Sequence, residues 1–167
     1  ALPIFKVPVY LIRWIFAFLQ GRTFDVKVGD VVSATSPILS SVPQGSSISP
    51  ILFSVFINDI PTRFHESEYT LLFADDLVAF FPFNGVKVSN LLAIKKTVSK
   101  YLEEIEEWLG KWRMKMAPSK CNFTIFSRTN HYKEQLNKSI EPKLFEESIP
   151  YEPNPISLGI TYDEKIN

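Results

Sequence analysis

Two adjacent carboxylates stand inside an otherwise apolar run, "YTLLFADDLVAFF", at residues 69–81. Like charges as close as Asp75 and Asp76 repel each other unless a cation joins them. Mg²⁺ suits that place because it prefers carboxylate oxygens together with water and phosphate oxygens. In phosphoryl transfer, two such ions hold the attacking and leaving oxygens in line. The pair therefore favours a metal-binding hairpin, and the alternative is a plain Asp-Asp turn, since Asp is common in turns.

A second stretch suited to phosphate lies upstream, where "SVPQGSSISPILFSVFINDIP" joins a Pro-Gln-Gly turn to an apolar helix. Gly45 lets the backbone approach a ligand closely, and free N–H groups at a helix start favour phosphate. We expect the helix at about residues 49–58, with Ser47 or Ser49 as N-cap and Pro50 in its first turn. The alternative is a loop that leads into a well-capped helix and binds nothing.

The acidic pair requires elements that hold it in place, and the pattern predicts short strands at residues 69–73 and 77–81 around Ala74-Asp75-Asp76. The longest periodic segment predicts an amphipathic helix over residues 89–112, with apolar side chains every three or four positions. These apolar residues are Leu91, Ile94, Val98, Tyr101, Ile105, Trp108 and Trp112. The two tryptophans fall on this stripe, which favours core packing over base stacking. The glutamates at 103, 104, 106 and 107 are most simply the solvated face.

Further elements are expected on both sides of these segments. Residues 8–20 predict a helix that begins near Pro8 and ends at Gly21, with Val9, Ile12, Phe16 and Leu19 on one stripe. Alternation broken at Gly29-Asp30 predicts a hairpin. Strands are expected at residues 121–127 and 156–163, and a short helix at residues 131–140. Because these elements mix without a strict βαβ repeat, the expected fold class is α+β.

The composition is that of a globular protein, with 167 residues, 46% hydrophobic residues and 22% charged residues. The formal net charge is zero, so bulk charge gives no sign of a nucleic-acid partner. The lone Cys121 excludes an internal disulfide and fits an intracellular location, in the nucleus or the cytoplasm. The apolar run at residues 7–19 contains Arg13 and is shorter than the ~20 residues that a membrane-spanning helix needs, so no membrane association is expected.

Taken together, "SVPQGSSISPILFSVFINDIP", "LLFADDLVAFF", "WRMKMAPSKCNFTIFS" and "ISLGITYD" resemble successive sequence blocks of reverse transcriptases, those of non-LTR (LINE-like) retrotransposons above all. The resemblance covers nearly the whole chain. It implies that Asp75 is the palm carboxylate that binds both catalytic metals and that Asp76 supports it. Phe73 and Ala74 complete the Phe-Ala-Asp-Asp box of that family.

The same resemblance assigns roles outside the acidic hairpin. Residues Pro43, Gln44, Gly45 and Ser46 match the loop that contacts the template strand and the incoming nucleotide. Lys120 matches a lysine near the leaving pyrophosphate, which could act as general acid, and the alternative is an ordinary loop lysine after Pro118. Leu158 and Gly159 match a block that lies near the primer grip in related enzymes.

The implied fold is a polymerase palm, an antiparallel sheet with packed helices, and residues 1–167 would form one partial palm domain. The implied activity is RNA-directed DNA polymerisation with Mg²⁺, an RNA template, a DNA primer and deoxynucleoside triphosphates. The third carboxylate and the fingers are expected before Ala1, and the thumb after Asn167, so the chain is expected to be a piece of a longer polypeptide that is inactive by itself. The alternative is an inactive or co-opted palm that binds RNA or a protein partner.

Overall fold

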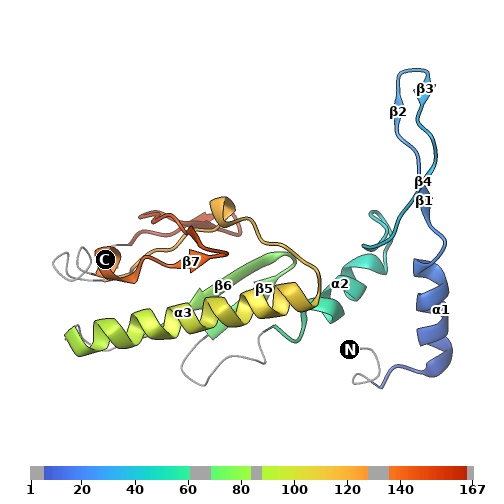
Figure 1. Cartoon of the computed structure of the whole chain (residues 1–167). Coiled ribbons are helices and arrows are strands. Elements are labelled where there is room, and N and C mark those ends of the chain that lie inside the picture. The colour runs from blue at the N-terminus through green and yellow to red at the C-terminus, as the bar shows by residue number, and fades with distance from the viewer. Residues whose placement is uncertain (1–5, 61–68, 84–87, 128–135, 165–167) are drawn as a thin grey trace. The chain divides into compact units, whose positions relative to one another are not determined.

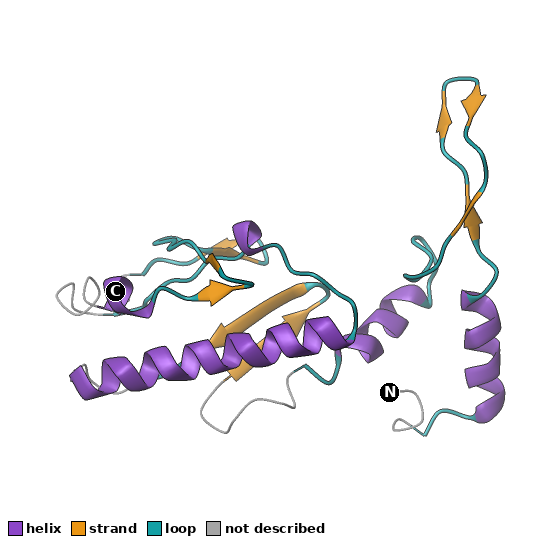
Figure 2. Ribbon diagram, viewed as in Figure 1, coloured by secondary structure: helices purple, strands orange, loops and turns teal. Residues whose placement is uncertain are grey.

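Helices and short antiparallel strand pairs make up the structure, a computed structural model that describes residues 6–60, 69–83, 88–127 and 136–164 (Figures 1 and 2). The mixture of helices and small antiparallel sheets confirms the α+β class. The chain divides into two compact units, Ala1–Asp59 and Ile60–Asn167. Each unit is described by itself below.

The first unit begins with α1 (Val9–Leu19), which lies where the sequence predicts a helix. Pro8 is its N-cap, and Gly21 follows the C-cap with a φ of 65°, a conformation that glycine adopts without a steric penalty. The predicted apolar stripe does not match the buried side of the helix, because Ile15 is buried while Val9 and Phe16 are exposed. The helix is apolar around most of its circumference, so periodicity alone does not select a face.

A two-stranded ribbon follows α1 and confirms the predicted hairpin. Its base is β1 (Thr23–Phe24) paired with β4 (Ser36–Pro37), and its tip is β2 (Lys27–Val28) paired with β3 (Val31–Val32). Both pairs are antiparallel, and Gly29 makes the tight reversal at the tip with a φ of 61°. Figure 1 shows the ribbon extending as a single arm with the turn between β2 and β3 at its end.

The first unit ends with α2 (Ser49–Ile57), which confirms the predicted helix to within a residue. Pro50 lies in the first turn, as expected. The predicted N-cap is wrong, because Ile48 occupies that position and no side chain caps the helix. The hydroxyl of Ser49 is turned away from the helix amides and donates instead to the carbonyl of Pro43.

The second unit contains the hairpin of β5 (Tyr69–Phe73) and β6 (Asp76–Phe80), two antiparallel strands in continuous register. Both predicted strands are confirmed, and β6 begins and ends one residue earlier than predicted. Asp76 is the first residue of β6 and lies opposite Phe73, so the turn consists of Ala74 and Asp75 alone.

The long helix α3 (Val88–Lys111) confirms the strongest prediction from periodicity. Its predicted stripe is buried at Tyr101, Ile105 and Trp108, whereas Trp112 lies just past the helix and is partly exposed. The ring of Phe81, just after β6, packs edge-on against the ring of Tyr101 at 5.1 Å between centroids. This contact fixes the base of the β5–β6 hairpin against α3.

The core beside α3 is completed by a segment far along the chain. Residues 136–140 are helical, and the rest of the helix expected at residues 131–140 lies outside the described residues. Leu136 and Ile140 are buried with Ile125 in one apolar cluster. The partly buried hydrophobics packed against that cluster are Phe83, Leu91, Ile94, Val98, Phe123 and Tyr151.

The strand predicted at residues 121–127 is wrong, because the described chain there forms one isolated bridge, Phe123 with Tyr151, in parallel orientation. The backbone of Phe123 accepts from Glu152 N–H and donates to the carbonyl of Pro150, at 2.9 and 3.0 Å. The facing segment contains Pro150, Pro153 and Pro155. Proline has no amide hydrogen, so a continuous ladder cannot form along it.

Two further hairpins end the described chain. The first, β7 (Lys143–Leu144) with β8 (Glu147–Ser148), is absent from the sequence predictions. Its turn residues Phe145 and Glu146 both have positive φ, and the amide of Phe145 donates to the Glu106 carboxylate on α3 at 2.5 Å. Glu106 therefore binds a backbone amide and is not simply part of a solvated face of α3, which corrects the interpretation from sequence.

The second is β9 (Ile156–Ser157) with β10 (Ile160–Thr161), where the sequence predicts a single strand. Leu158 and Gly159 form its turn with φ values of 51° and 77°. Positive φ at both central residues is the signature of a type I′ reversal, the turn that best fits the twist of a two-residue hairpin.

Candidate functional site

The acidic pair lies at the tip of the β5–β6 hairpin. Asp75 is the second residue of the two-residue turn, and Asp76 opens β6. Ala74 takes a φ of 51°, a left-handed conformation that costs a residue with a Cβ about 1–2 kcal/mol. The two strands pair without a break up to Phe73 and Asp76, so only two residues connect them. This tight turn places both aspartates at the same end of the hairpin.

Both aspartates are exposed, and so is one side of the strand that precedes them. Exposure alternates along β5, where Tyr69, Leu71 and Phe73 are open and the residues between them are half-buried. Phe73 retains 65% of its surface, so the apolar run that surrounds the carboxylates is not an interior position in this chain. The hairpin thus presents two negative charges and an apolar face to whatever lies against it.

The oxygen donors at this tip fit a divalent cation in their chemistry. Asp75 and Asp76 supply hard carboxylate oxygens, the ligand type that Mg²⁺ prefers. Within the described ranges, no three His, Cys, Asp or Glu residues come together in a group that could hold a metal ion. The tip therefore provides part of a ligand set, and substrate phosphates, water or other carboxylates would have to complete it.

The Pro-Gln-Gly segment is a tight turn fixed to the start of α2. The carbonyl of Pro43 accepts the Ser49 hydroxyl at 2.6 Å and the Ser46 amide at 3.4 Å. Gly45 has a φ of 83°, which excludes most other residues without strain. Gln44 is exposed at this turn. The segment thus holds one amide side chain outward on a fixed backbone.

Lys120 is the last residue of a short 3-10 helix, η2 (Pro118–Lys120), whose first residue is buried. Its side chain is exposed, and its amide donates to the carbonyl of Ala117 at 3.0 Å. Among the residues that the structure describes, it forms no hydrogen bond or ion pair with Asp75 or Asp76. The structure fixes its backbone and leaves its ammonium free to meet a ligand.

The remaining assignments are distributed over both units. Leu158 and Gly159 form the β9–β10 turn in the second unit, which also contains the acidic hairpin and Lys120. The Pro43–Ser46 loop belongs to the first unit.

Two ionisable groups in the second unit depart from their ordinary behaviour. Burial raises the pKa of the Cys121 thiol above its ordinary value. Partial burial, followed by the neighbouring Glu164 carboxylate, raises the pKa of Tyr151 to about 12. The Tyr151 hydroxyl donates to that carboxylate and links the segment before β9 to the end of the described chain.

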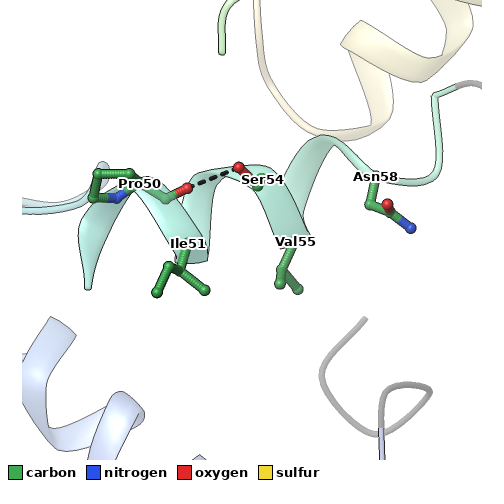
Figure 3. A pocket seen from close by; sticks show the side chains of 5 residues that line it. All are labelled: Pro50, Ile51, Ser54, Val55 and Asn58. Atoms are coloured by element: carbon green, nitrogen blue, oxygen red, sulfur yellow. Dashed lines mark hydrogen bonds between the residues drawn. The ribbon is translucent and has the colours of Figure 1, made fainter. Parts of the chain in front are cut away.

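A shallow groove runs along one face of α2 (Figure 3). It is lined by Pro50, Ile51, Ser54, Val55 and Asn58, all from α2 or its end. The Ser54 hydroxyl is occupied by the carbonyl of Pro50 at 3.0 Å. Because its lining is mostly apolar and contains no acidic or basic side chain, the groove has the character of a contact surface.

Sequence reasoning missed the contacts that Arg22 and the Ser49 hydroxyl make with the segment that leads into α2. Arg22 donates to carbonyls on either side of the ribbon, and Ser49 donates to Pro43. Neither contact has a local signature, because Arg22 reaches the carbonyls of Ser40 and Ser41 across the ribbon and Ser49 donates to a carbonyl outside its helix. Ser49 is the buried polar residue of the described chain, with 5% of its surface exposed, and its position before an apolar helix suggested only a cap.

Comparison with known families identifies the class of protein. Residues 2–155 match the family described as reverse transcriptase (RNA-dependent DNA polymerase). The match includes the Pro43–Ser46 loop, the acidic hairpin and Lys120, and it ends before the β9–β10 hairpin. The chain belongs to the reverse transcriptase family.

Individual relatives narrow this class to mobile elements. The chain is 31% identical over 170 residues to the RNA-directed DNA polymerase from mobile element jockey of Drosophila melanogaster, covering 98% of this chain and 17% of that protein. It is 27% identical to the jockey polymerase of Drosophila funebris, covering 93% of this chain and 16% of that protein. The probable RNA-directed DNA polymerase from transposon X-element of Drosophila melanogaster is 23% identical, over 90% of this chain and 16% of its own length.

The chain therefore spans about a sixth of the length of these relatives, 17% of the first. Their names confirm the retrotransposon type of reverse transcriptase that the sequence blocks resemble. No solved structure matches the chain. None of the helices in the described ranges combines the length and the apolar character needed to cross a membrane.

Proposed function

We propose that this chain is part of the palm of an RNA-directed DNA polymerase encoded by a non-LTR retrotransposon. The observation that carries the proposal is the family match over residues 2–155, which contains two adjacent carboxylates at the tip of a tight hairpin. The substrates would be an RNA template, a DNA primer and deoxynucleoside triphosphates. The fingers, the thumb and a third carboxylate would come from other parts of the longer polypeptide.

The reaction joins the primer 3′-hydroxyl to the α-phosphate of the nucleotide and releases pyrophosphate. Asp75 and Asp76 would hold divalent metal, with Mg²⁺ the ion whose ligand preferences they meet. When bound, such ions neutralise charge on the phosphates and align the attacking and leaving oxygens. The short turn at Ala74 keeps both carboxylates at one point, so little reorganisation is needed when the substrate arrives.

The remaining residues would bind and orient the substrates. Gln44, exposed on its fixed turn, would contact the template strand and the incoming nucleotide, and Gly45 would let their backbones approach closely. Lys120 would donate a proton to the departing pyrophosphate, since its ammonium has no other partner among the described residues. The Leu158-Gly159 turn would lie toward the primer. Each of these roles follows from the family resemblance at the matching positions.

The test is primer extension on an RNA template by the full-length protein carrying Asp75→Asn, which removes the charge and keeps the side-chain size. Loss of one metal ligand removes several kcal/mol of transition-state stabilisation, so the rate should fall about a thousandfold. Asp30→Asn, at the exposed tip of the ribbon, is the matched control and should leave the rate unchanged. An unchanged rate for Asp75→Asn would contradict the metal role of Asp75. No primer extension by the unsubstituted full-length protein, with RNA binding retained, would favour the alternative, a palm that binds RNA without catalysis.

A further inference from the structure

Arg22 joins three segments of the first unit. Its Nε donates to the carbonyl of Leu19 at the end of α1, at 3.0 Å. Its Nη2 donates to the carbonyls of Ser41, at 2.5 Å, and Ser40, at 3.4 Å. Its own backbone carbonyl accepts the amide of Ile38 at 2.8 Å. A single half-buried side chain thus ties the end of α1 to the chain that leaves the ribbon.

The segment that Arg22 holds needs an anchor. Ser40 and Ser41 lie in the loop between β4 and α2, outside regular structure (Figure 2). Ser41 has a φ of 78°, which is unfavourable for a residue with a Cβ. Hydrogen bonds from a charged donor are roughly twice as strong as those between neutral groups. The guanidinium therefore stabilises a backbone conformation that the loop would otherwise leave.

The same loop is anchored at its other end. The carbonyl of Pro43 accepts the hydroxyl of Ser49, which is buried at the start of α2. Gln44 and Gly45 follow that carbonyl directly. Before these two residues, Arg22 holds the backbone at Ser41. The Pro43 carbonyl is bound to the first turn of α2. Both anchors lie within the first unit.

We propose that Arg22 is a positioning residue that sets the orientation of the Pro43–Ser46 loop for the incoming nucleotide. It acts through the carbonyls of Ser40 and Ser41 and touches no substrate itself. The proposal rests on the proposed function of this loop in a polymerase. Arginine suits the role because its planar fork donates in several fixed directions at once, whereas the lysine ammonium is a compact point charge.

The kinetic test uses the full-length polymerase with Arg22→Ala, Arg22→Lys and Gln44→Ala. Arg22→Ala should raise KM for the deoxynucleotide about tenfold while kcat stays within about twofold, because the loop loses its preset orientation and the reacting groups stay intact. Arg22→Lys should fall between Arg22→Ala and wild type. Arg13→Ala removes an exposed arginine from α1 and should change neither constant.

A double variant separates a positioning role from general damage. If Arg22 acts through the loop, Arg22→Ala should change KM little once Gln44→Ala has already removed the side chain that the loop presents. A full tenfold effect in the Gln44→Ala background would overturn the proposal. So would an unchanged KM for Arg22→Ala alongside a raised KM for Gln44→Ala.

Hydrogen exchange gives a readout that does not need activity. In Arg22→Ala, amides in residues 40–46 should exchange about fivefold faster than in wild type or Arg13→Ala, because the anchored loop opens more often. Exchange unchanged in that segment overturns the proposal. If Arg22→Ala fails to fold, Arg22→Lys carries the same measurements. Full activity of Asp75→Asn would instead contradict the proposed function. Hydrogen exchange would then still show whether Arg22 anchors the loop.

Discussion

At the scale of single residues, the hydroxyl of Ser49 contributes measurably to the local stability of the loop before α2. It is buried and donates to the carbonyl of Pro43 at 2.6 Å. Ser49→Ala leaves that carbonyl with the longer bond from the Ser46 amide, at 3.4 Å. We expect the loop to lose about 1 kcal/mol of local stability, so the Ser46 amide should exchange about fivefold faster. Site-resolved hydrogen exchange measures this directly.

The matched control is Ser54→Ala on the same helix. Ser54 is exposed, and its hydroxyl donates to the carbonyl of Pro50 one turn earlier. Such a bond contributes little to helix stability. Exchange at Ser46 should be unaffected. Equal acceleration in both variants would contradict a specific role for Ser49, since the loss of any hydroxyl from α2 would then have the same effect.

Residue types in the sequence predict the acidic hairpin and the Gln44 turn, because their chemistry is local and distinctive. The sequence also points to Ser49 as a residue that stabilises the start of α2, but with the wrong partner. Arg22 could not be found this way. It binds Ser40 and Ser41 across the ribbon, and an isolated arginine after a helix has no pattern that indicates such a contact.

At the scale of elements, two glycines with equally open surroundings should respond in opposite ways to alanine. An added Cβ would meet nothing within 4 Å at Gly110, inside α3, or at Gly159, in the β9–β10 turn. Gly110→Ala should stabilise the chain by about 0.5–1 kcal/mol through helix propensity. Gly159→Ala should destabilise it by about 1 kcal/mol because its φ is 77°.

Urea unfolding of the 167-residue chain at one protein concentration, followed by tryptophan fluorescence, measures both changes as shifts of the midpoint. Space for the new methyl group is the same at the two positions, so the comparison isolates backbone conformation. A shift in the same direction for both variants would contradict the turn conformation at Gly159.

How well an element is predicted depends on how much of its signal is local. The long helix α3 repeats its apolar spacing over many turns, so its ends are predicted to within a residue. The β7–β8 hairpin was missed because Phe145 and Glu146, not Gly or Asn, occupy its positive-φ turn. Its conformation is stabilised by Glu106 from α3, a contact between segments that no local pattern contains.

At the scale of the whole molecule, many apolar side chains of the described residues are exposed. Leu39 retains 91% of its surface, and Val28 and Val31, which face each other across the tip of the ribbon, retain 73% each. Contiguous apolar patches and free strand edges both promote association.

The ribbon should therefore be the main site at which the isolated 167-residue chain associates with itself. Both edges of a two-stranded ribbon carry unpaired N–H and C=O groups, and two strands alone are only marginally stable in water. Val28→Lys combined with Val31→Lys places two charges on that tip and removes its apolar pair. We expect the association constant to fall at least about tenfold, since charge on an edge strand blocks edge-to-edge pairing.

Sedimentation velocity over a range of protein concentrations measures the constant. The control must add the same charge elsewhere, so Val9→Lys combined with Tyr10→Lys on exposed positions of α1 is the matched variant. Similar weakening in both double variants would mean that net charge, which is zero in the natural chain, governs association. Weakening confined to the ribbon variant would locate the contact at β2 and β3, whose free edges and exposed valines would then drive the association.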